Sequence, residues 1–202
     1  MGEMWALTVD TAPTDEPVTR TEAKAHLRVT DTAEDSLIDD MIAAARIAAE
    51  AYMRRAITTQ TLKLHLPGWP SDPYIELPKP PLSSVTSVKY TDKDGDESTM
   101  TATDYVVVTA QDPGRIALKW DKSWPSTSLQ VGLPIVIEYV AGYGAESTID
   151  KDIKQAVNIL VAQQYENREP VVVGTIIREI PMTAKWLMND RRVHQYRFGG
   201  LP

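Results

Sequence analysis

The sequence predicts an α+β protein in which a small antiparallel β domain is inserted into a helical bundle. Three observations support this fold class. Apolar residues recur at helical spacing in residues 17–57, alternate with a period of two in residues 58–144, and return to helical spacing from residue 149 onward. Because the two helical regions flank the strands in the sequence, we expect the strands to leave and re-enter a single bundle.

Two helices are expected in the first helical region, at residues 19–29 and 31–56. The shorter one begins at Thr19 with Glu22 three residues later, a capping box in which each side chain bonds the other residue's backbone N–H. The longer one carries a continuous apolar stripe and an alanine-rich middle that permits another helix to approach closely. Its acidic residues occupy the first half, where the helix dipole favours negative charge. They are Asp31, Glu34, Asp35, Asp39 and Asp40.

The middle region is expected to form a small antiparallel sheet or barrel. Segments such as TLKLHL, DYVVVT and LPIVIEYVAGYG are strand-like, and prolines punctuate the early part, where they suit turns and edge positions. The segment DKDGDES contains the Asp-Gly pair of a hairpin turn. A calcium loop is disfavoured there, because Gly95 comes two positions too early and Thr103 stands where the bidentate glutamate belongs.

Two further helices are expected at residues 149–168 and 182–190. In the first, Ile153, Val157 and Val161 share one face, and the second is expected to add Trp186 and Leu187 to the core. The expected divisions of the chain are an N-terminal arm at residues 1–16, a bundle domain at residues 17–57 and 145–190, a β domain at residues 58–144, and a C-terminal tail at residues 191–202.

Composition restricts the function classes. The chain of 202 residues has 21 basic and 28 acidic residues, a net charge of −7, and no cysteine. The acidic balance disfavours sequence-unspecific gripping of DNA or an anionic membrane. The lack of cysteine excludes disulfides, thiolate metal sites and a cysteine nucleophile. No stretch approaches a membrane-spanning length and the N-terminus does not have the pattern of a secretory signal, so we expect a cytosolic protein or part of a soluble particle.

No recognisable motif predicts catalysis or cofactor binding. His26, His65 and His194 lie in different elements without metal-ligand spacing, and the nucleotide-binding and hydrolase motifs are missing. The acidic run of the long helix could supply a general acid/base pair, but a solvated helix face is the commoner reason for such a run. We therefore expect no enzymatic activity and no metal or other cofactor.

The segment VVVGTII, at residues 171–177, is the most unusual stretch of the chain. It is apolar and strongly β-prone, yet it lies between two expected helices. A buried strand or hairpin and an exposed surface that awaits another subunit are both consistent with this pattern.

Six segments, taken in order, resemble the head-to-tail connector proteins of tailed double-stranded DNA phages and prophages. They are PVTRTEAKAHLRV, EDSLIDDMIAAARIAAEAYMRRAITTQT, IELPKPPLSSVTSVKYTDKDG, DPGRIAL, IEYVAGYG and IKQAVNILVAQQYENRE. The resemblance covers Pro17 to about Glu169 and implies an adaptor, or head-completion protein, of the long form with a β insertion. In such proteins many copies, commonly twelve, form a ring below the portal that extends the DNA channel and provides a platform for the stopper or tail.

This resemblance implies three groups of contact residues. Family members use the C-terminal segment to reach the portal protein, which indicates Arg191, Arg192, Tyr196, Arg197 and Phe198. Carboxylates that face the channel would repel phosphate and let double-stranded DNA pass without specific binding, which indicates Asp31, Glu34, Asp35, Asp39 and Asp40. Contact with a neighbouring subunit or the stopper is expected at Val171, Val172, Val173, Ile176 and Ile177.

The combined expectation is a structural virion protein of the head-to-tail neck, present in the host cytoplasm during assembly. Its expected partners are other copies of itself, the portal protein and a stopper or tail-completion protein, with no membrane. Deletion of residues 191–202 is expected to leave a folded protein that no longer binds the portal. Two alternatives stay open: a tail-completion ring that binds tail-tube protein, and a phage enzyme with an unrecognised site.

Overall fold

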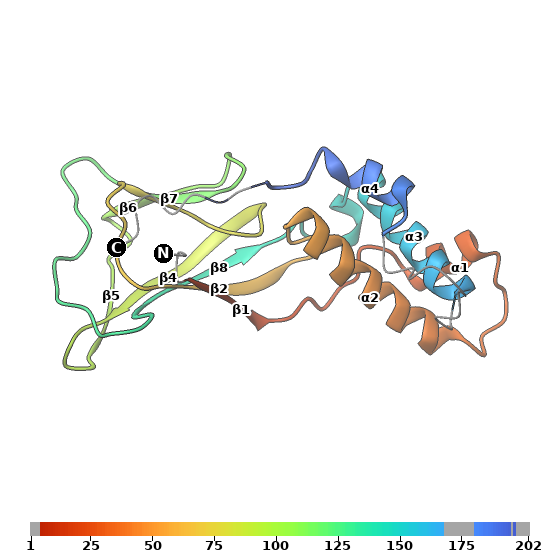
Figure 1. The fold of residues 1–202 in the computed structure, drawn as a ribbon, viewed down its shortest axis with the longest axis horizontal. Helices are drawn as coiled ribbons and strands as arrows, with labels where there is room; N and C mark the ends of the chain where they lie inside the picture. Colours follow the sequence, from red (N-terminus) through yellow and green to blue (C-terminus); the bar gives the residue numbers. More distant parts are fainter. Residues whose placement is uncertain (1–4, 168–179, 195, 197–202) are drawn as a thin grey trace, which may run out of the picture. The chain divides into compact units, whose positions relative to one another are not determined.

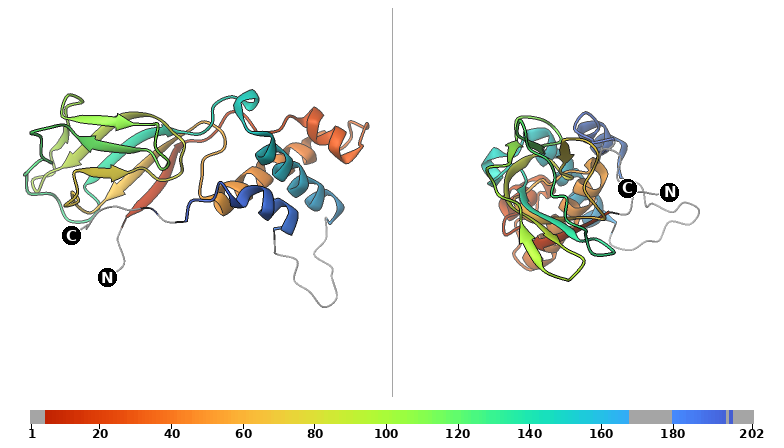
Figure 2. Two further views of the ribbon diagram at one scale, coloured as in Figure 1. Left: turned by 90° about the horizontal axis from the view of Figure 1, so that it is seen from above. Right: turned by 90° about the vertical axis from the view of Figure 1, so that its left-hand side faces the viewer.

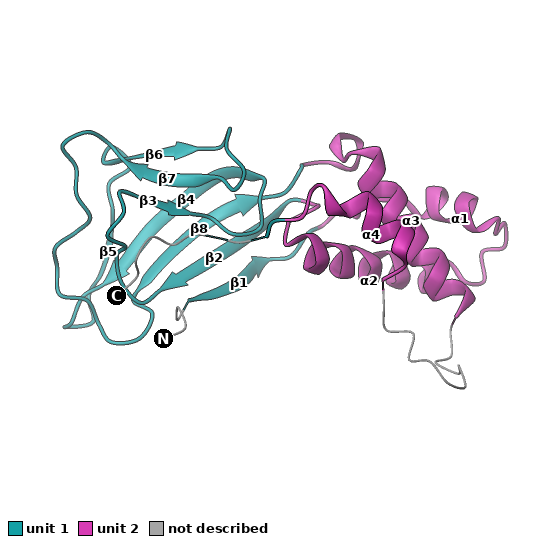
Figure 3. Ribbon diagram, turned by 45° about the horizontal axis from the view of Figure 1, so that its top comes forward, with its two compact units in different colours: residues 1–13, 59–143, 193–202 teal, residues 14–58, 144–192 magenta. Residues whose placement is uncertain are grey.

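The computed structural model describes residues 5–167, 180–194 and 196 (Figure 1). The chain divides into two compact units, shown in Figure 3. Unit 1 comprises residues 1–13, 59–143 and 193–202, and unit 2 comprises residues 14–58 and 144–192. All described strands belong to unit 1 and all described α-helices to unit 2, so the expected α+β class is confirmed.

Unit 1 contains a five-stranded antiparallel sheet in the order β1-β2-β8-β4-β5. These strands are β1 (Ala6–Thr11), β2 (Gln60–Leu66), β8 (Ile135–Ala141), β4 (Leu82–Thr91) and β5 (Glu97–Thr99). The alternation of β2 and β8 buries every second residue, and Leu64 of β2 pairs with Ile137 of β8. The central position of β8 explains why it is among the most apolar strands of the chain.

A smaller antiparallel sheet completes unit 1 in the order β3-β7-β6. Its strands are β3 (Tyr74–Glu76), β7 (Arg115–Leu118) and β6 (Tyr105–Val108), and Figure 2 shows it beside the larger sheet. Ile75 and Ile116 pair across β3 and β7 and are fully buried. Buried Tyr139 of β8 donates its hydroxyl proton to the Pro78 carbonyl oxygen at 2.7 Å, which satisfies the one polar atom that this side chain brings into the core.

The expected N-terminal arm at residues 1–16 contains strand β1, which corrects that expectation. Leu7 pairs with Leu64, and a register shift between Val9 and Thr11 interrupts the ladder at this edge of the sheet. The alternation of Leu7 and Val9 covers too few residues to distinguish a strand from an extended arm. Only pairing with β2, which is distant in sequence, reveals it.

Unit 2 contains four α-helices and a short 3₁₀ turn among its described residues. They are α1 (Arg20–Leu27), α2 (Asp35–Met53), the turn η1 (Glu146–Thr148), α3 (Lys151–Glu166) and α4 (Met182–Asn189). Helix α3 packs against both α2 and α4. Most of the apolar stripes predicted from the sequence form the core, with Ile38 and Ile42 of α2 and Ile153 and Val157 of α3 at most 2% exposed. Leu37, which was expected to belong to the α2 stripe, is 38% exposed, because it lies beside the buried row on the helix surface.

The helix boundaries differ from the expected ones at α2. The capping box of α1 is present, since the Thr19 hydroxyl accepts the Glu22 N–H and the Glu22 carboxylate accepts the Thr19 N–H. Helix α2, expected at residues 31–56, begins later because the Asp31 carboxylate accepts the Ala33 N–H in a turn. It ends at Met53 because Arg54 adopts a left-handed conformation with φ 56°.

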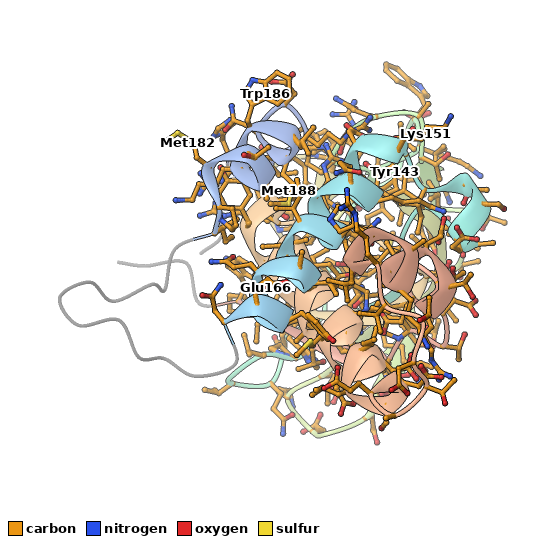
Figure 4. The ribbon with its side chains drawn as sticks, turned by 90° about the vertical axis from the view of Figure 1, so that its right-hand side faces the viewer. Tyr143, Lys151, Glu166, Met182, Trp186 and Met188 are labelled. Atoms are coloured by element: carbon orange, nitrogen blue, oxygen red, sulfur yellow. The ribbon has the colours of Figure 1, made fainter. Side chains whose placement is uncertain are left out.

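Helix α4 turns the opposite face to the core from the one expected. Ala184 and Met188 are fully buried, whereas Trp186 is 76% exposed, and Figure 4 shows Trp186 and Met182 pointing away from the other helices. Leu187, also expected in the core, is half-buried. Both pairs, 182/186 and 184/188, are apolar at helical spacing, so the pattern alone does not select a face.

Candidate functional site

The acidic residues expected to face a channel are mostly engaged by cations of α1. Arg20 Nε donates to Asp39 Oδ1 at 2.8 Å, and Arg20 Nη1 lies 3.3 Å from Asp35 Oδ2. Lys24 Nζ contacts the other oxygen of Asp35 at 2.5 Å. The hydrogen bond and charge of Arg20 lower the pKa of the Asp39 carboxyl, so this group stays ionised at neutral pH. The acidic side chains of α2 beside α1 therefore belong to a mixed ionic cluster and do not form a row of unpaired carboxylates.

The other three acidic residues of this set have different surroundings. Glu34 accepts a hydrogen bond from the Tyr165 hydroxyl of α3 at 2.5 Å. The Asp31 carboxylate accepts the Ala33 N–H in the turn before α2, and the Asp31 backbone carbonyl oxygen accepts a hydrogen bond from Lys24 Nζ. Asp40 is exposed and has no hydrogen-bonding or ionic partner among the described residues. Of the acidic run, Asp35 and Asp39 are therefore paired with cations of α1, Glu34 and Asp31 accept other hydrogen bonds within unit 2, and Asp40 is unpaired among the described residues.

Part of the expected C-terminal tail is built into the helical unit. Arg191 contacts Asp150 Oδ2 at 2.7 Å through Nη1 and Asp152 Oδ2 at 2.6 Å through Nε, and its carbonyl oxygen accepts the Arg55 side chain. The Arg192 guanidinium lies 4.9 Å from the centre of the Tyr52 ring. These contacts fasten the end of α4 to the first turn of α3 and the end of α2.

Tyr196 is also held within the fold, in unit 1. Its hydroxyl accepts the backbone N–H of Lys79 at 3.1 Å, and the preceding Val193 is buried. A tail that begins at residue 191 is therefore wrong, because residues 191–193 and 196 have intramolecular contacts. Of the residues expected to contact the portal, Arg197 and Phe198 lie outside the described residues, as do Val171, Val172, Val173, Ile176 and Ile177.

Sequence reasoning missed a buried ionic network in unit 2. Arg46 Nε donates to Glu16 Oε2 at 2.8 Å, and Arg46 Nη1 lies 3.7 Å from Glu50 Oε2. Glu50 is 4% exposed, and its Oε1 accepts the backbone N–H of Ile57 at 2.9 Å. The i, i+4 spacing of Arg46 and Glu50 was the available signal. The network fixes the chain on both sides of α2.

A groove lies between the first half of α2 and the end of α3. Its lining residues are Leu37, Asp40, Met41, Ala44, Gln164 and Asn167. The floor is apolar, while the acidic and amide side chains supply polar atoms. Asp40 belongs to this groove, so the groove combines an apolar surface with an exposed carboxylate that has no partner among the described residues.

In unit 1 an aromatic cluster borders a second, polar hollow. The Trp69 and Trp124 rings stack with centroids 5.1 Å apart, and Tyr90 meets Trp69 edge-on at 5.8 Å. Tyr90, Trp124 and Asp104 line the hollow, and Asp104 pairs with Lys122 at 2.7 Å. The described lining therefore has no pair of carboxylates or histidines poised for acid/base chemistry.

Neither a metal centre nor a membrane span emerges from the described residues. Within them, no three His, Asp or Glu side chains gather closely enough to hold a metal ion. None of the helices that the structure describes combines the length and apolar character needed to cross a bilayer.

Comparison with known proteins identifies the family. Residues 17–172, more than half of the chain, match the head completion protein family. The chain belongs to this family. The comparison with curated proteins gives no match.

Solved structures place similar chains in particle necks. A chain from the neck of an empty gene transfer agent (GTA) particle computed with C6 symmetry is 27% identical, with a TM-score of 0.78 over 98% of this chain and 100% of that one. A chain from the neck of the native GTA particle computed with C12 symmetry is 28% identical, with a TM-score of 0.73 over 98% and 100%. A third, from the virion of the native particle, is 26% identical, with a TM-score of 0.76 over 97% and 99%.

Membership of the head completion protein family, together with the similarity to neck subunits, supports a structural role for this chain. This agrees with the expectation of a connector protein, and the twelve-fold symmetry of one matched neck is consistent with the expected dodecamer.

Proposed function

We propose that this head completion protein is an adaptor that forms a ring below the portal, extends the DNA channel and provides the docking platform for the stopper or tail. The observation that carries the proposal is similarity along nearly the whole chain, units 1 and 2 together, to subunits of symmetric necks. A ring of identical copies needs two different contact surfaces on each copy.

The lumen of this ring is proposed to include the acidic cluster of Asp31, Glu34, Asp35 and Asp39. Arg20 and Lys24 compensate part of its charge, but the carboxylates outnumber the two cations, so the cluster keeps a negative field. A modestly negative wall repels phosphate without holding counterions strongly, which suits passage of DNA. Asp40 is left out of this proposed lining because it belongs to the groove between α2 and α3.

Contact with the portal is proposed for the end of the chain from Arg197 onward, with Arg197 and Phe198 as anchors. Arginine and aromatic side chains are enriched at interface hot spots. Because Arg191, Arg192 and Tyr196 already have contacts within the fold, the informative truncation removes residues 197–202 and leaves those contacts intact. This truncated protein is expected to fold normally and to lose binding to purified portal.

The deciding experiment is cryo-electron microscopy of tailless, DNA-filled heads with and without the added protein. A ring of this chain directly below the portal, with the acidic cluster toward the lumen, is the expected result. Heads that stay bare while the protein decorates tails would refute the adaptor role and support the alternative of a tail-completion ring. A ring whose acidic cluster faces outward would keep the adaptor role and refute the proposed lining.

A further inference from the structure

We propose that the exposed face of α4 in one copy docks into the groove between α2 and α3 of a second copy. The α4 face consists of Met182 and Trp186, with Asn189 one turn further on. The α2–α3 groove is the one lined by Leu37, Asp40, Met41, Ala44, Gln164 and Asn167. The inference rests on the proposed ring and names the contact that joins its subunits.

The α4 face is an apolar surface that none of the described residues of unit 2 covers. Met182 is 84% exposed and Trp186 is 76% exposed, although they lie four residues apart on one side of the helix (Figure 4). Exposed apolar side chains that are grouped in this way mark interaction surfaces, and tryptophan is the residue most enriched at interface hot spots. The opposite face of α4, with Ala184 and Met188, already supplies the helix's contact with the core.

The exposed positions beside the groove follow the spacing of a helix-packing seam. Leu37, Asp40, Ala44 and Ile47 of α2 are all exposed and succeed one another at intervals of three and four residues. Leu37 is 38% and Ile47 58% exposed. Ala44 lies in the middle of this row, where its small side chain permits the close approach of another helix. The seam runs from Leu37 to Ile47, ten helical steps or about 15 Å at 1.5 Å per residue, which exceeds the length of the α4 face.

The chemistry of the two surfaces is complementary. The groove is an open depression of ≈ 450 Å³, a volume large enough for an aromatic side chain, and its apolar lining residues are Leu37, Met41 and Ala44. An indole ring buries a large apolar body but also carries an N–H that needs an acceptor when water is removed. Asp40 supplies that acceptor, since its carboxylate has no partner among the described residues.

A second copy is the occupant because one heterologous contact covers both surfaces at once. In a closed ring each subunit donates one patch to the next subunit and receives a different patch from the previous one. Unit 2 carries both surfaces on separate elements: the α4 face lies on α4, and the α2–α3 groove lies between the other two helices. Repetition of the same contact then leaves neither surface exposed in any copy.

Engineered disulfides can test this contact directly, because the natural chain has no cysteine. Met182 and Asn189 lie one turn before and one turn after Trp186, so each can carry a cysteine while the tryptophan is kept. We would combine Ala44→Cys with Met182→Cys, and separately with Asn189→Cys, in particles assembled from the full chain. The matched control combines Ala44→Cys with Ala25→Cys, which is exposed and belongs to α1, a different helix from the one that carries the α4 face.

Mild oxidation is expected to give a ladder of covalent oligomers in at least one test pair, because a disulfide requires Cα atoms within about 7 Å. The control pair is expected to give no ladder. A neck ring that is seen by cryo-electron microscopy but yields no ladder from either pair would overturn this inference and leave the proposed function intact. Necks without the protein would refute the proposed function itself.

A further variant addresses the groove's other possible occupant, the chain's own apolar segment at residues 171–177. Ala44→Cys combined with Val173→Cys is expected to stay reduced in the monomer. An intramolecular disulfide in the isolated protein would show that the groove is covered from within the same chain and would overturn the inference.

Trp186→Ala is expected to abolish ring incorporation while the thermal unfolding of the monomer is unchanged, since that side chain is exposed. Normal incorporation of Trp186→Ala would also refute the contact.

Discussion

Substitution of Glu50 separates two roles that its buried carboxylate has in unit 2. One oxygen accepts the backbone N–H of Ile57 at 2.9 Å, and the other lies 3.7 Å from Arg46 Nη1. Glu50→Gln keeps the shape of the side chain and an oxygen acceptor, now that of an amide, but removes the charge. Glu50→Ala removes the charge, the acceptor and the buried side-chain stem, so its loss beyond that of Glu50→Gln contains the contribution of the acceptor together with that of the lost packing.

The expected magnitudes follow from these contacts. An orphaned buried N–H costs about 2 kcal/mol, because the group gives up its bond to water without a replacement. The ion pair contributes less, about 1 kcal/mol, since its separation is long and Arg46 keeps its closer contact with Glu16 at 2.8 Å. We therefore expect the free energy of unfolding to fall by about 1 kcal/mol in Glu50→Gln and about 3 kcal/mol in Glu50→Ala.

Urea unfolding followed by far-ultraviolet circular dichroism measures this difference. The helical signal reports on unit 2, because all described α-helices lie in that unit. Equal losses in the two variants would refute the acceptor role and assign the stabilisation to charge. A loss below about 1 kcal/mol in Glu50→Ala would show that water replaces the carboxylate at the Ile57 N–H.

Two further substitutions test other contacts. Asp39 has a pKa held below its ordinary value of 3.8 by Arg20, so its stabilising contribution is present above that pH and is lost as the pH falls through the lowered pKa. Acid titration of helicity should therefore show a smaller loss of helical signal between about pH 4 and pH 2 in Asp39→Asn than in the natural protein. Asp40→Asn, at the unpaired carboxylate, is the control. Identical titration curves for Asp39→Asn and the natural protein would contradict the pairing. Gly114→Ala should lower the free energy of unfolding of unit 1 by about 1–3 kcal/mol, because the new Cβ would lie 2.4 Å from Leu82 Cβ, and an unchanged fluorescence-monitored urea midpoint would contradict this packing.

Features that depend on residues close in sequence were predictable. The capping box of α1 needs only Thr19 and Glu22, and it forms as expected. Most of the core stripe of α2 also follows from spacing, since Ile38, Met41 and Ile42 are buried as the helical period predicts. The face of α4 could not be chosen, since Ala184 and Met188 compete with Met182 and Trp186 at the same spacing.

Features that depend on distant residues were not predictable from the pattern. The acidic run of α2 reads as a uniformly negative face, but the packing of α1 brings Arg20 to Asp35 and Asp39. Likewise, Arg191 reads as part of an open tail until α3 presents Asp150 and Asp152 to it. In both cases the partner's charge was visible in the sequence, whereas the proximity came only from tertiary structure.

The order of strands in the larger sheet determines when this sheet can form during synthesis of the chain. Strands β2 and β4 do not pair with each other, because each pairs with β8, the last of the described strands to leave the ribosome. Until residue 141 emerges, the nascent sheet consists of two separate ladders, β1 with β2 and β4 with β5, that share no hydrogen bonds. The single strand β8 then closes both ladders in one late step. A ribosome that stalls before β8 would leave two open β-edges exposed, so translation through this segment sets the moment at which a subunit becomes safe from aggregation.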